Sequence, residues 1–188
     1  MERHIPRGVT LLELLVVVAI LAILVTLGIP ALDHLLQKNR LRAAAESLLT
    51  TLHQARAETL AHPDAAQRIH ISLYRNAQDP GDWCFGLRRG APCNCRLRDV
   101  TEQDACVLDR AGVPVLKVVS ATEFPAVRLR NVAFGVDDYT LFHPARGTAR
   151  AGHATFALQQ DLRVVLSPLG RARLCSPAPA YLPGYPAC

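Results

Sequence analysis

The feature that most constrains this chain is a long apolar run near its N-terminus, from Gly8 to Ala31. Between Leu14 and Leu27 no residue is charged and only Thr26 is polar. With its flanks, the run approaches the roughly 20 residues that a helix needs to cross a bilayer core. The sequence therefore predicts a membrane-inserted helix at residues 9–31.

The charges around this run predict its orientation. Arg3, His4 and Arg7 precede it, and the next basic Lys or Arg residue is Lys38. By the positive-inside rule the N-terminus stays in the cytoplasm and the remainder of the chain crosses to the other side. The run continues into a helical pattern without a small-residue cleavage site, so we expect the helix to be retained and not removed as a secretory signal.

Length and composition leave room for one modest globular domain, residues 32–188. The chain has 188 residues, of which 50% are hydrophobic and 20% charged, so this part can bury a core and is not a disordered tail. The formal net charge is +5. Such a moderate excess indicates an acidic partner only if the basic residues cluster.

Residues 32–62 have the pattern of an amphipathic helix. Its apolar stripe recurs at alternating spacings of four and three residues, through Leu41, Ala45, Leu48, Leu52, Ala55 and Thr59. Pro63 ends the helix by its position. Upstream, Gly28 and Pro30 lie inside the continuing helix, where Pro removes a hydrogen bond, so a kink or a locally melted stretch is expected.

Short apolar or alternating segments follow, from residue 66 to residue 175, and predict strands. They are 67–75, 83–87, 114–120, 127–136, 139–143, 153–158 and 162–166, and residues 88–110 between them are expected to form a loop. Several such strands after one long helix predict an α+β fold in which an antiparallel sheet packs on the helix. The Pro-rich tail, residues 176–188, should be extended and tethered at its end.

All six cysteines lie after the apolar run, in the part expected outside the cytoplasm, where disulfides form. They are Cys84, Cys93, Cys95, Cys106, Cys175 and Cys188. Six cysteines allow 15 pairings, and we favour Cys175 with Cys188, with two bridges among the other four. A zinc site is the alternative, but Cys93-Asn94-Cys95 lacks the usual gap and no His follows at the required spacing.

The sequence contains no motif of enzymatic chemistry. It has no Gly-x-Ser-x-Gly elbow and no phosphate-binding P-loop. The histidines show no His-x-x-x-His pair that would hold a metal. We therefore expect a protein that is not an enzyme and that needs neither cofactor nor metal.

The N-terminal residues resemble the signature of type IV pilins. A hydrophilic leader, Met1 to Gly8, is followed by Val9-Thr10-Leu11-Leu12-Glu13. The resemblance implies that a prepilin peptidase cuts between Gly8 and Val9 and methylates Val9, which makes Glu13 the fifth residue of the mature chain. It also implies the pilin fold, a place in the bacterial inner membrane with the domain in the periplasm, and later assembly with other pilins or pseudopilins into a filament on the cell surface.

Glu13 stands out on physical grounds as well. A carboxylate inside an apolar membrane helix costs a few kcal/mol and needs a partner or a route to the interface. The resemblance implies that the partner is the Val9 amine of a neighbouring subunit, which gives Glu13 a role in assembly. The alternative is a side chain that only extends to the lipid headgroups.

A second informative stretch is Asp161 to Cys175, DLRVVLSPLGRARLC. Ser167-Pro168-Leu169-Gly170 is typical of a turn. If an extended segment follows, Arg171 and Arg173 lie on one face, about 7 Å apart, with Ala172 and Leu174 behind them. From Thr140 onward the chain contains five arginines, Arg146, Arg150, Arg163, Arg171 and Arg173, and one carboxylate, Asp161. Guanidinium groups beside a turn suit phosphate oxygens, although a solvated basic edge is the alternative interpretation.

The phrase RVVLSPLGRAR, together with the N-terminal signature and the helix phrase NRLRAAA, is similar to the GspH/FimT family of minor pilins and pseudopilins. In its FimT branch a Gly-Arg-x-Arg motif is implicated in DNA binding during natural transformation, and Gly170 to Arg173 match it. The resemblance therefore implies a minor pilin that binds the DNA backbone without reading sequence. The excess of C-terminal arginines adds Arg146, Arg150 and Arg163 as further candidate contacts. Two alternatives stay open: a minor pseudopilin of a type II secretion system, and a minor pilin that only primes assembly.

Overall fold

The computed structural model describes residues 10–62, 64, 68–135, 137–179 and 181–188. The chain divides into two compact units, residues 1–38 and 39–188. The long helix α1 (Leu11–Ala61) contributes to both units, and its helical assignment is continuous through Gly28 and Pro30. The locally melted stretch expected at these two residues is therefore absent.

The helix ends at Ala61, two residues before Pro63, which is outside the described residues. Among the residues that are described, no helix combines the length and the apolar character of a membrane span.

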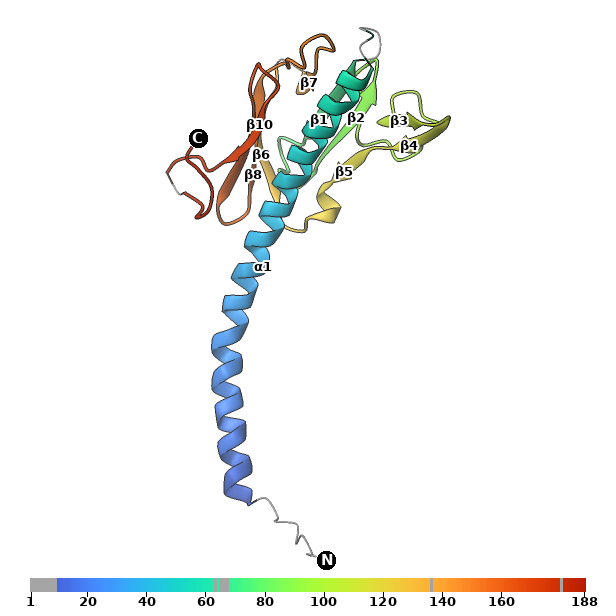
Figure 1. Cartoon of the computed structure of the whole chain (residues 1–188). Helices are drawn as coiled ribbons and strands as arrows, with labels where there is room; N and C mark the ends of the chain where they lie inside the picture. Colours follow the sequence, from blue (N-terminus) through green and yellow to red (C-terminus); the bar gives the residue numbers. More distant parts are fainter. Residues whose placement is uncertain (1–9, 63, 65–67, 136, 180) are drawn as a thin grey trace, which may run out of the picture. The chain divides into compact units, whose positions relative to one another are not determined.

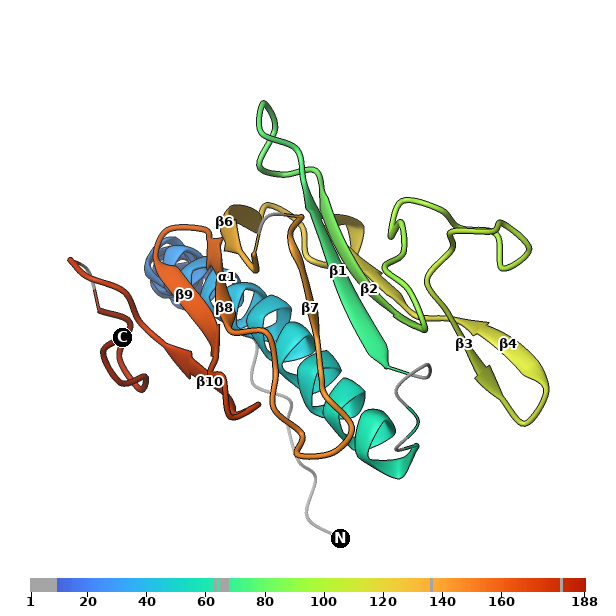
Figure 2. The ribbon, with the colours of Figure 1, turned by 90° about the horizontal axis from the view of Figure 1, so that it is seen from above.

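The second unit contains two four-stranded antiparallel sheets and a hairpin, and Figures 1 and 2 show both sheets beside the second half of α1. The first sheet has the order β5-β2-β1-β7, with β1 (Ile69–Arg75), β2 (Trp83–Arg89), β5 (Val118–Ser120) and β7 (Tyr139–Leu141). The second has the order β10-β9-β8-β6, with β6 (Arg128–Ala133), β8 (Gly152–Ala157), β9 (Asp161–Leu166) and β10 (Ala172–Cys175). The predicted α+β class, a helix packed on antiparallel strands, is confirmed.

The strands form two sheets and a hairpin where the sequence predicted one sheet, and two further differences involve the separate hairpin. Its strands are β3 (Val107–Arg110), which falls inside the expected loop, and β4 (Val113–Leu116). The expected single strand 114–120 is split at Lys117, whose N–H donates to Cys106 O and whose carbonyl accepts from Leu87 N. Because Lys117 bonds to two different segments, the strand before it pairs with β3 and the strand after it pairs with β2.

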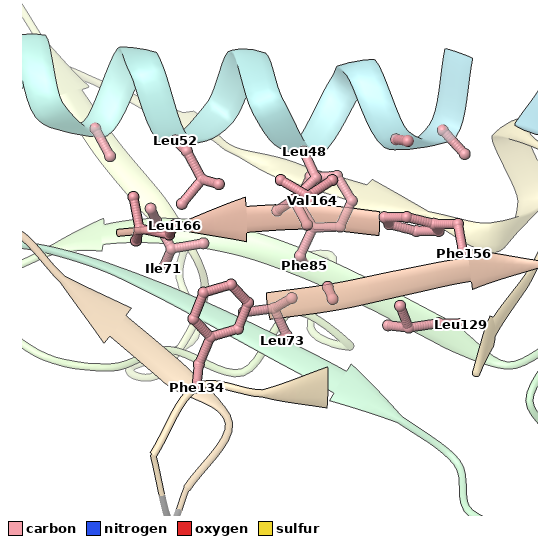
Figure 3. Close-up of a cluster of buried hydrophobic side chains, with 14 of the residues drawn as sticks. Leu48, Leu52, Ile71, Leu73, Phe85, Leu129, Phe134, Phe156, Val164 and Leu166 are labelled. Atoms are coloured by element: carbon pink, nitrogen blue, oxygen red, sulfur yellow. The ribbon is translucent and has the colours of Figure 1, made fainter. Parts of the chain in front are cut away.

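The apolar stripe of α1 forms the centre of the core, as the periodicity predicts. Every member of the predicted stripe is buried, with at most 2% exposed: Leu41, Ala45, Leu48, Leu52, Ala55 and Thr59. Figure 3 shows Leu48 and Leu52 facing side chains from both sheets, among them Phe85 of the first and Val164 of the second. One helix face thus holds the two sheets together.

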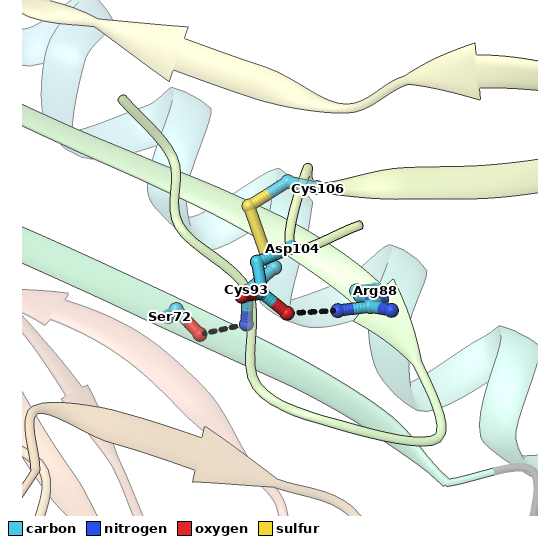
Figure 4. Close-up of polar contacts among 5 residues, drawn as sticks. All are labelled: Ser72, Arg88, Cys93, Asp104 and Cys106. Atoms are coloured by element: carbon cyan, nitrogen blue, oxygen red, sulfur yellow. Dashed lines mark hydrogen bonds and ion pairs between the residues drawn. A yellow bond between two sulfur atoms is a disulfide. The ribbon is translucent and has the colours of Figure 1, made fainter. Parts of the chain in front are cut away.

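All six cysteines are paired in disulfides, so their sulfurs are not available to a zinc site. Cys84–Cys95 fastens the loop after β2 to the first sheet, and Cys93–Cys106 joins the same loop to the residue before β3. Figure 4 shows this loop, where the Cys93 N–H donates to Ser72 Oγ (3.0 Å) and Arg88 pairs with Asp104 (3.4 Å). The third bridge is the expected Cys175–Cys188.

That third bridge closes the tail into a loop directly after β10. Ser176 N donates to Pro186 O and Cys188 N to Ser176 O, which brings the end of the loop back to its beginning. Leu182, in the middle of the loop, is 1% exposed and belongs to the main core. The tail is therefore part of the folded domain.

Candidate nucleic-acid interface

The predicted turn exists and joins β9 to β10. Ser167 N donates to Arg171 O (2.9 Å), and Gly170 N donates to Ser167 O (2.9 Å). The hydroxyl of Ser167 accepts the N–H of Arg171 (3.2 Å). Gly170 has φ +71°, in the left-handed region that favours glycine. Turn chemistry thus fixes the backbone immediately before Arg171.

The alternation expected after this turn is present. Arg171 and Arg173 are exposed, whereas Ala172 and Leu174 are partly buried and pack against the main core. Strand β10 is an edge strand that pairs only with β9 within its sheet, and Arg173 lies opposite Val165. The two guanidinium groups therefore stand on the solvent side of a sheet edge.

The other three arginines named from the sequence lie in different surroundings. Arg146 is exposed in the loop between β7 and β8. Arg150 is partly buried, with its guanidinium carbon 4.7 Å from the ring centre of Tyr139. Arg163, on β9, donates from Nε to Thr155 Oγ1 (3.0 Å). Of the predicted site residues, Arg146, Arg171 and Arg173 are thus exposed, whereas Arg150 and Arg163 are more confined.

Arg163 shares the outer face of the second sheet with a histidine. The register pairs Thr155 with Arg163 and His153 with Val165, so His153 and Arg163 stand in adjacent rows of that face. Burial lowers the pKa of His153, and the nearby Arg163 guanidinium lowers it further. His153 therefore adds no permanent charge beside Arg163, whereas Arg173, which lies opposite Val165, does.

Among the described residues, several exposed arginines take part in no ion pair, both near the C-terminus and elsewhere, for example Arg110 and Arg128. Within the described part of the chain, the ion pairs are Arg42–Glu46, Arg88–Asp104, Arg89–Glu58 and Arg130–Asp161. Arg146, Arg171 and Arg173 belong to none of them. Exposed guanidinium groups without a carboxylate at hand remain available to an external anion.

Three assembly residues named from the sequence lie in the first unit. Gly8 and Val9 are outside the described residues, so the structure gives no geometry for the cleavage site. Glu13 is in the first turn of α1, where its backbone N–H donates to Thr10 Oγ1 (3.2 Å). A carboxylate at this end of a helix is favoured by the helix dipole.

Sequence reasoning missed two residues that the structure brings to the turn, Gly147 and Arg56. A Cβ on Gly170 would lie 2.0 Å from the carbonyl oxygen of Gly147, and one on Gly147 would lie 3.2 Å from Arg56 Nε. The sequence signal for Gly147 is the Arg146-Gly147 pair, which has the same two residue types as Gly170-Arg171 in the β9–β10 turn. Nothing in the local sequence of α1 indicated Arg56.

A search of solved structures matches this chain to the type IV minor pilin FimU of Pseudomonas aeruginosa. The two share 17% sequence identity with a TM-score of 0.47, over 73% of this chain and 89% of that chain. The search of curated proteins finds no match.

The comparison with protein families finds the prokaryotic N-terminal methylation motif at residues 4–29. This segment includes Gly8, Val9 and Glu13, the residues that the resemblance assigns to processing and assembly. The motif precedes a domain in which one long helix packs on antiparallel sheets. At its N-terminus the chain is therefore similar to proteins that carry the prokaryotic N-terminal methylation motif.

Proposed function

We propose that this protein is a minor type IV pilin that assembles into a pilus and binds DNA through its C-terminal arginines, for uptake of DNA in natural transformation. The observation that carries the proposal is the β9–β10 turn. There Gly170 fixes the backbone, and Arg171 and Arg173 are exposed without a partner among the ion pairs of the described residues.

The N-terminal segment supports the assembly half of the proposal. Prepilin peptidase would cut after Gly8 and methylate Val9, leaving a helix that anchors the protein in the inner membrane before assembly. The large apolar side chains of α1 from Leu11 to Val25 are all at least 47% exposed in the single chain. A helix that is apolar on every side needs lipid or other helices around it. Neighbouring pilins in a filament supply such helices, and Glu13 would pair there with the Val9 amine of the next subunit.

The chemistry of the turn supports contact with phosphate groups without base reading. A guanidinium group binds phosphate oxygens in a planar two-pronged geometry, and such contacts carry no sequence information. About three phosphate contacts would give a salt slope near −2.7 for duplex DNA. Binding should therefore be weak, similar for unrelated sequences, and strongly reduced by salt.

The decisive experiment removes the two arginines and measures DNA affinity. The full-length protein in non-ionic detergent is titrated with fluorescent duplexes of unrelated sequence over a range of salt concentrations. The Arg171→Ala/Arg173→Ala double variant should bind much more weakly, with a salt slope smaller by about 1.8 because two phosphate contacts are lost.

A matched control separates the site from net charge. The Arg110→Ala/Arg128→Ala variant also removes two exposed arginines, from β3 and β6. It should bind DNA nearly as the wild type does. Equal affinity of all three proteins would reject the DNA site and favour a pseudopilin of a secretion system or a minor pilin that only primes assembly.

A further inference from the structure

The β9–β10 turn does not stand alone, because a second glycine turn packs directly on it. This is the turn at 143–148 between β7 and β8, closed by hydrogen bonds from Gly147 N to His143 O and from His143 N to Thr148 O. Ala149 N donates to Pro168 O (3.0 Å), which ties the two connections together. A Cβ on Gly170 would lie 2.0 Å from Gly147 O, so the two backbones are in van der Waals contact.

This contact brings two exposed arginines from distant parts of the sequence to one place. Arg146 directly precedes Gly147, and Arg171 directly follows Gly170. Both turns are fixed by internal hydrogen bonds, and both glycines are buried with positive φ, +59° and +71°. The positions of the two arginine backbones are therefore set before any ligand arrives.

A third arginine lies behind the same contact. Arg56 of α1 approaches Gly147 so closely that a Cβ there would lie 3.2 Å from Nε and 3.6 Å from Nη2. Its Nε is buried and has no hydrogen-bond partner, and Arg56 takes part in no ion pair of the described residues. A partly buried cation that lacks a counter-charge is unfavourable, and a phosphate held nearby would offset that cost.

A bound DNA backbone could instead follow the outer face of the second sheet from Arg173 to Arg163. This face is less suited to an anion than the two glycine turns are. Arg163 already donates to Thr155. Asp161 stands two residues away on the same face of β9, where its carboxylate pairs with Arg130 (2.8 Å). A DNA backbone on this face would approach a carboxylate. The two glycine turns contain no Asp or Glu, and their Lys and Arg residues are Arg146 and the adjoining Arg171.

We propose that the phosphate-binding surface continues from Arg171 across the Gly147 turn to Arg146, with Arg56 behind it, and does not continue along the sheet to Arg163. The inference rests on the proposed function and names its DNA path. Arg146 and Arg171 contact separate phosphates of the same backbone. Arg56 acts as a positioning residue: it adds positive charge behind the surface and packs against Gly147.

Single charge-removing variants of the full-length protein in non-ionic detergent test this path by the same DNA titration. Arg146→Gln should weaken binding several-fold and reduce the salt slope by about 0.9, the value of one phosphate contact. Arg56→Gln should also weaken binding, and Arg56→Lys, which keeps the charge, should recover part of the loss. Arg163→Gln is the matched control and should leave the slope unchanged.

The outcomes separate this inference from the proposed function. If Arg146→Gln and Arg56→Gln bind as the wild type does while Arg171→Ala/Arg173→Ala binds weakly, the path is wrong and the proposed function stands. If Arg163→Gln reduces the slope and Arg146→Gln does not, the DNA follows the sheet face. If the double variant has no effect, the proposed function fails. Emission of Trp83, which is buried, reports whether each variant is folded, and the exposed Arg146 tests the path even if Arg56→Gln does not fold.

Discussion

At the scale of single residues, Gly170 determines whether the basic turn can form. It combines φ +71° with a backbone contact at the position that a Cβ would occupy. The strain of the left-handed conformation and the clash with Gly147 O act together. Gly170→Ala should therefore lower the free energy of unfolding by about 3 kcal/mol and weaken DNA binding, because both turns must move apart.

Urea unfolding followed by Trp83 emission measures this effect, and Gly112 provides the control. Gly112 also has positive φ (+81°), but among the described residues nothing apart from its two chain neighbours lies within 4 Å of the position that its Cβ would occupy. Gly112→Ala should cost only about 1 kcal/mol, the strain alone. Equal losses for the two variants would show that the contact with Gly147 does not matter.

His70 makes the stability of the domain depend on pH. It is 9% exposed, its Nδ1 is buried with no hydrogen-bond partner among the described residues, and its ring centre lies 5.7 Å from that of Tyr139. Burial lowers its pKa from the ordinary 6.5, and the charge of Arg68 lowers it further. The folded state thus binds fewer protons than the unfolded state at pH values below 6.5.

The sign of the effect follows from this difference in bound protons. Stability should fall as the pH decreases from 6.5 towards the folded-state pKa, because protonating His70 costs more in the folded protein. His153, whose pKa is also lowered, acts in the same direction. Urea midpoints measured between about pH 5 and 7 should depend less steeply on pH in His70→Gln than in the wild type. An unchanged dependence would mean that His70 does not contribute.

At the scale of elements, α1 is the part on which both sheets depend. Leu48 is fully buried and packs in the core between them, whereas Leu60 on the same helix is 49% exposed. Leu48→Ala should destabilise the domain by about 3 kcal/mol, through lost burial and the cavity left behind. Leu60→Ala should change stability by no more than about 0.5 kcal/mol. Urea unfolding of both variants checks the pair, and a comparable loss at Leu60 would contradict it.

Elements governed by local chemistry could be predicted from the sequence. The α1 stripe follows from the helical period of its apolar residues, and the β9–β10 turn follows from Ser167, Pro168 and Gly170 within four consecutive residues. Strand β3 could not be predicted, because its residues lie in a Cys-rich stretch and only pairing with β4 makes them a strand. The division at Lys117 likewise depends on hydrogen bonds to Cys106 and Leu87, which are distant in the sequence.

In the candidate site too, some residues could be predicted from the local sequence and others depend on tertiary contacts. Arg171 and Arg173 were evident because two arginines two residues apart follow a turn. Arg146 could be named only by its charge, and its place beside Gly170 comes from a contact between two connections that no local pattern encodes. Arg56 reaches the site only because α1 packs beneath it.

At the scale of the whole molecule, the positive charge is unevenly distributed along the chain, and Arg146 and Arg171 stand beside two turns that contact each other. From Thr140 onward the chain has five arginines and one aspartate, and the aspartate is already paired with Arg130. A filament that repeated or capped this surface would present a basic patch to a polyanion while its apolar helices were covered by neighbouring subunits. Long-range attraction of this kind raises the rate of capture more than it fixes the final geometry.

The closed tail has a mechanical consequence for such a surface. A ligand drawn under tension from Arg173 would pull on an edge strand, and an edge strand joined to one neighbour can be peeled away from its end. Here that end is Cys175, which is covalently bound to Cys188 in a loop whose Leu182 is inside the core. Separating β10 from β9 at this end would also require Leu182 to leave the core. The disulfide and the buried Leu182 therefore stabilise β10 at the end where separation from β9 would begin.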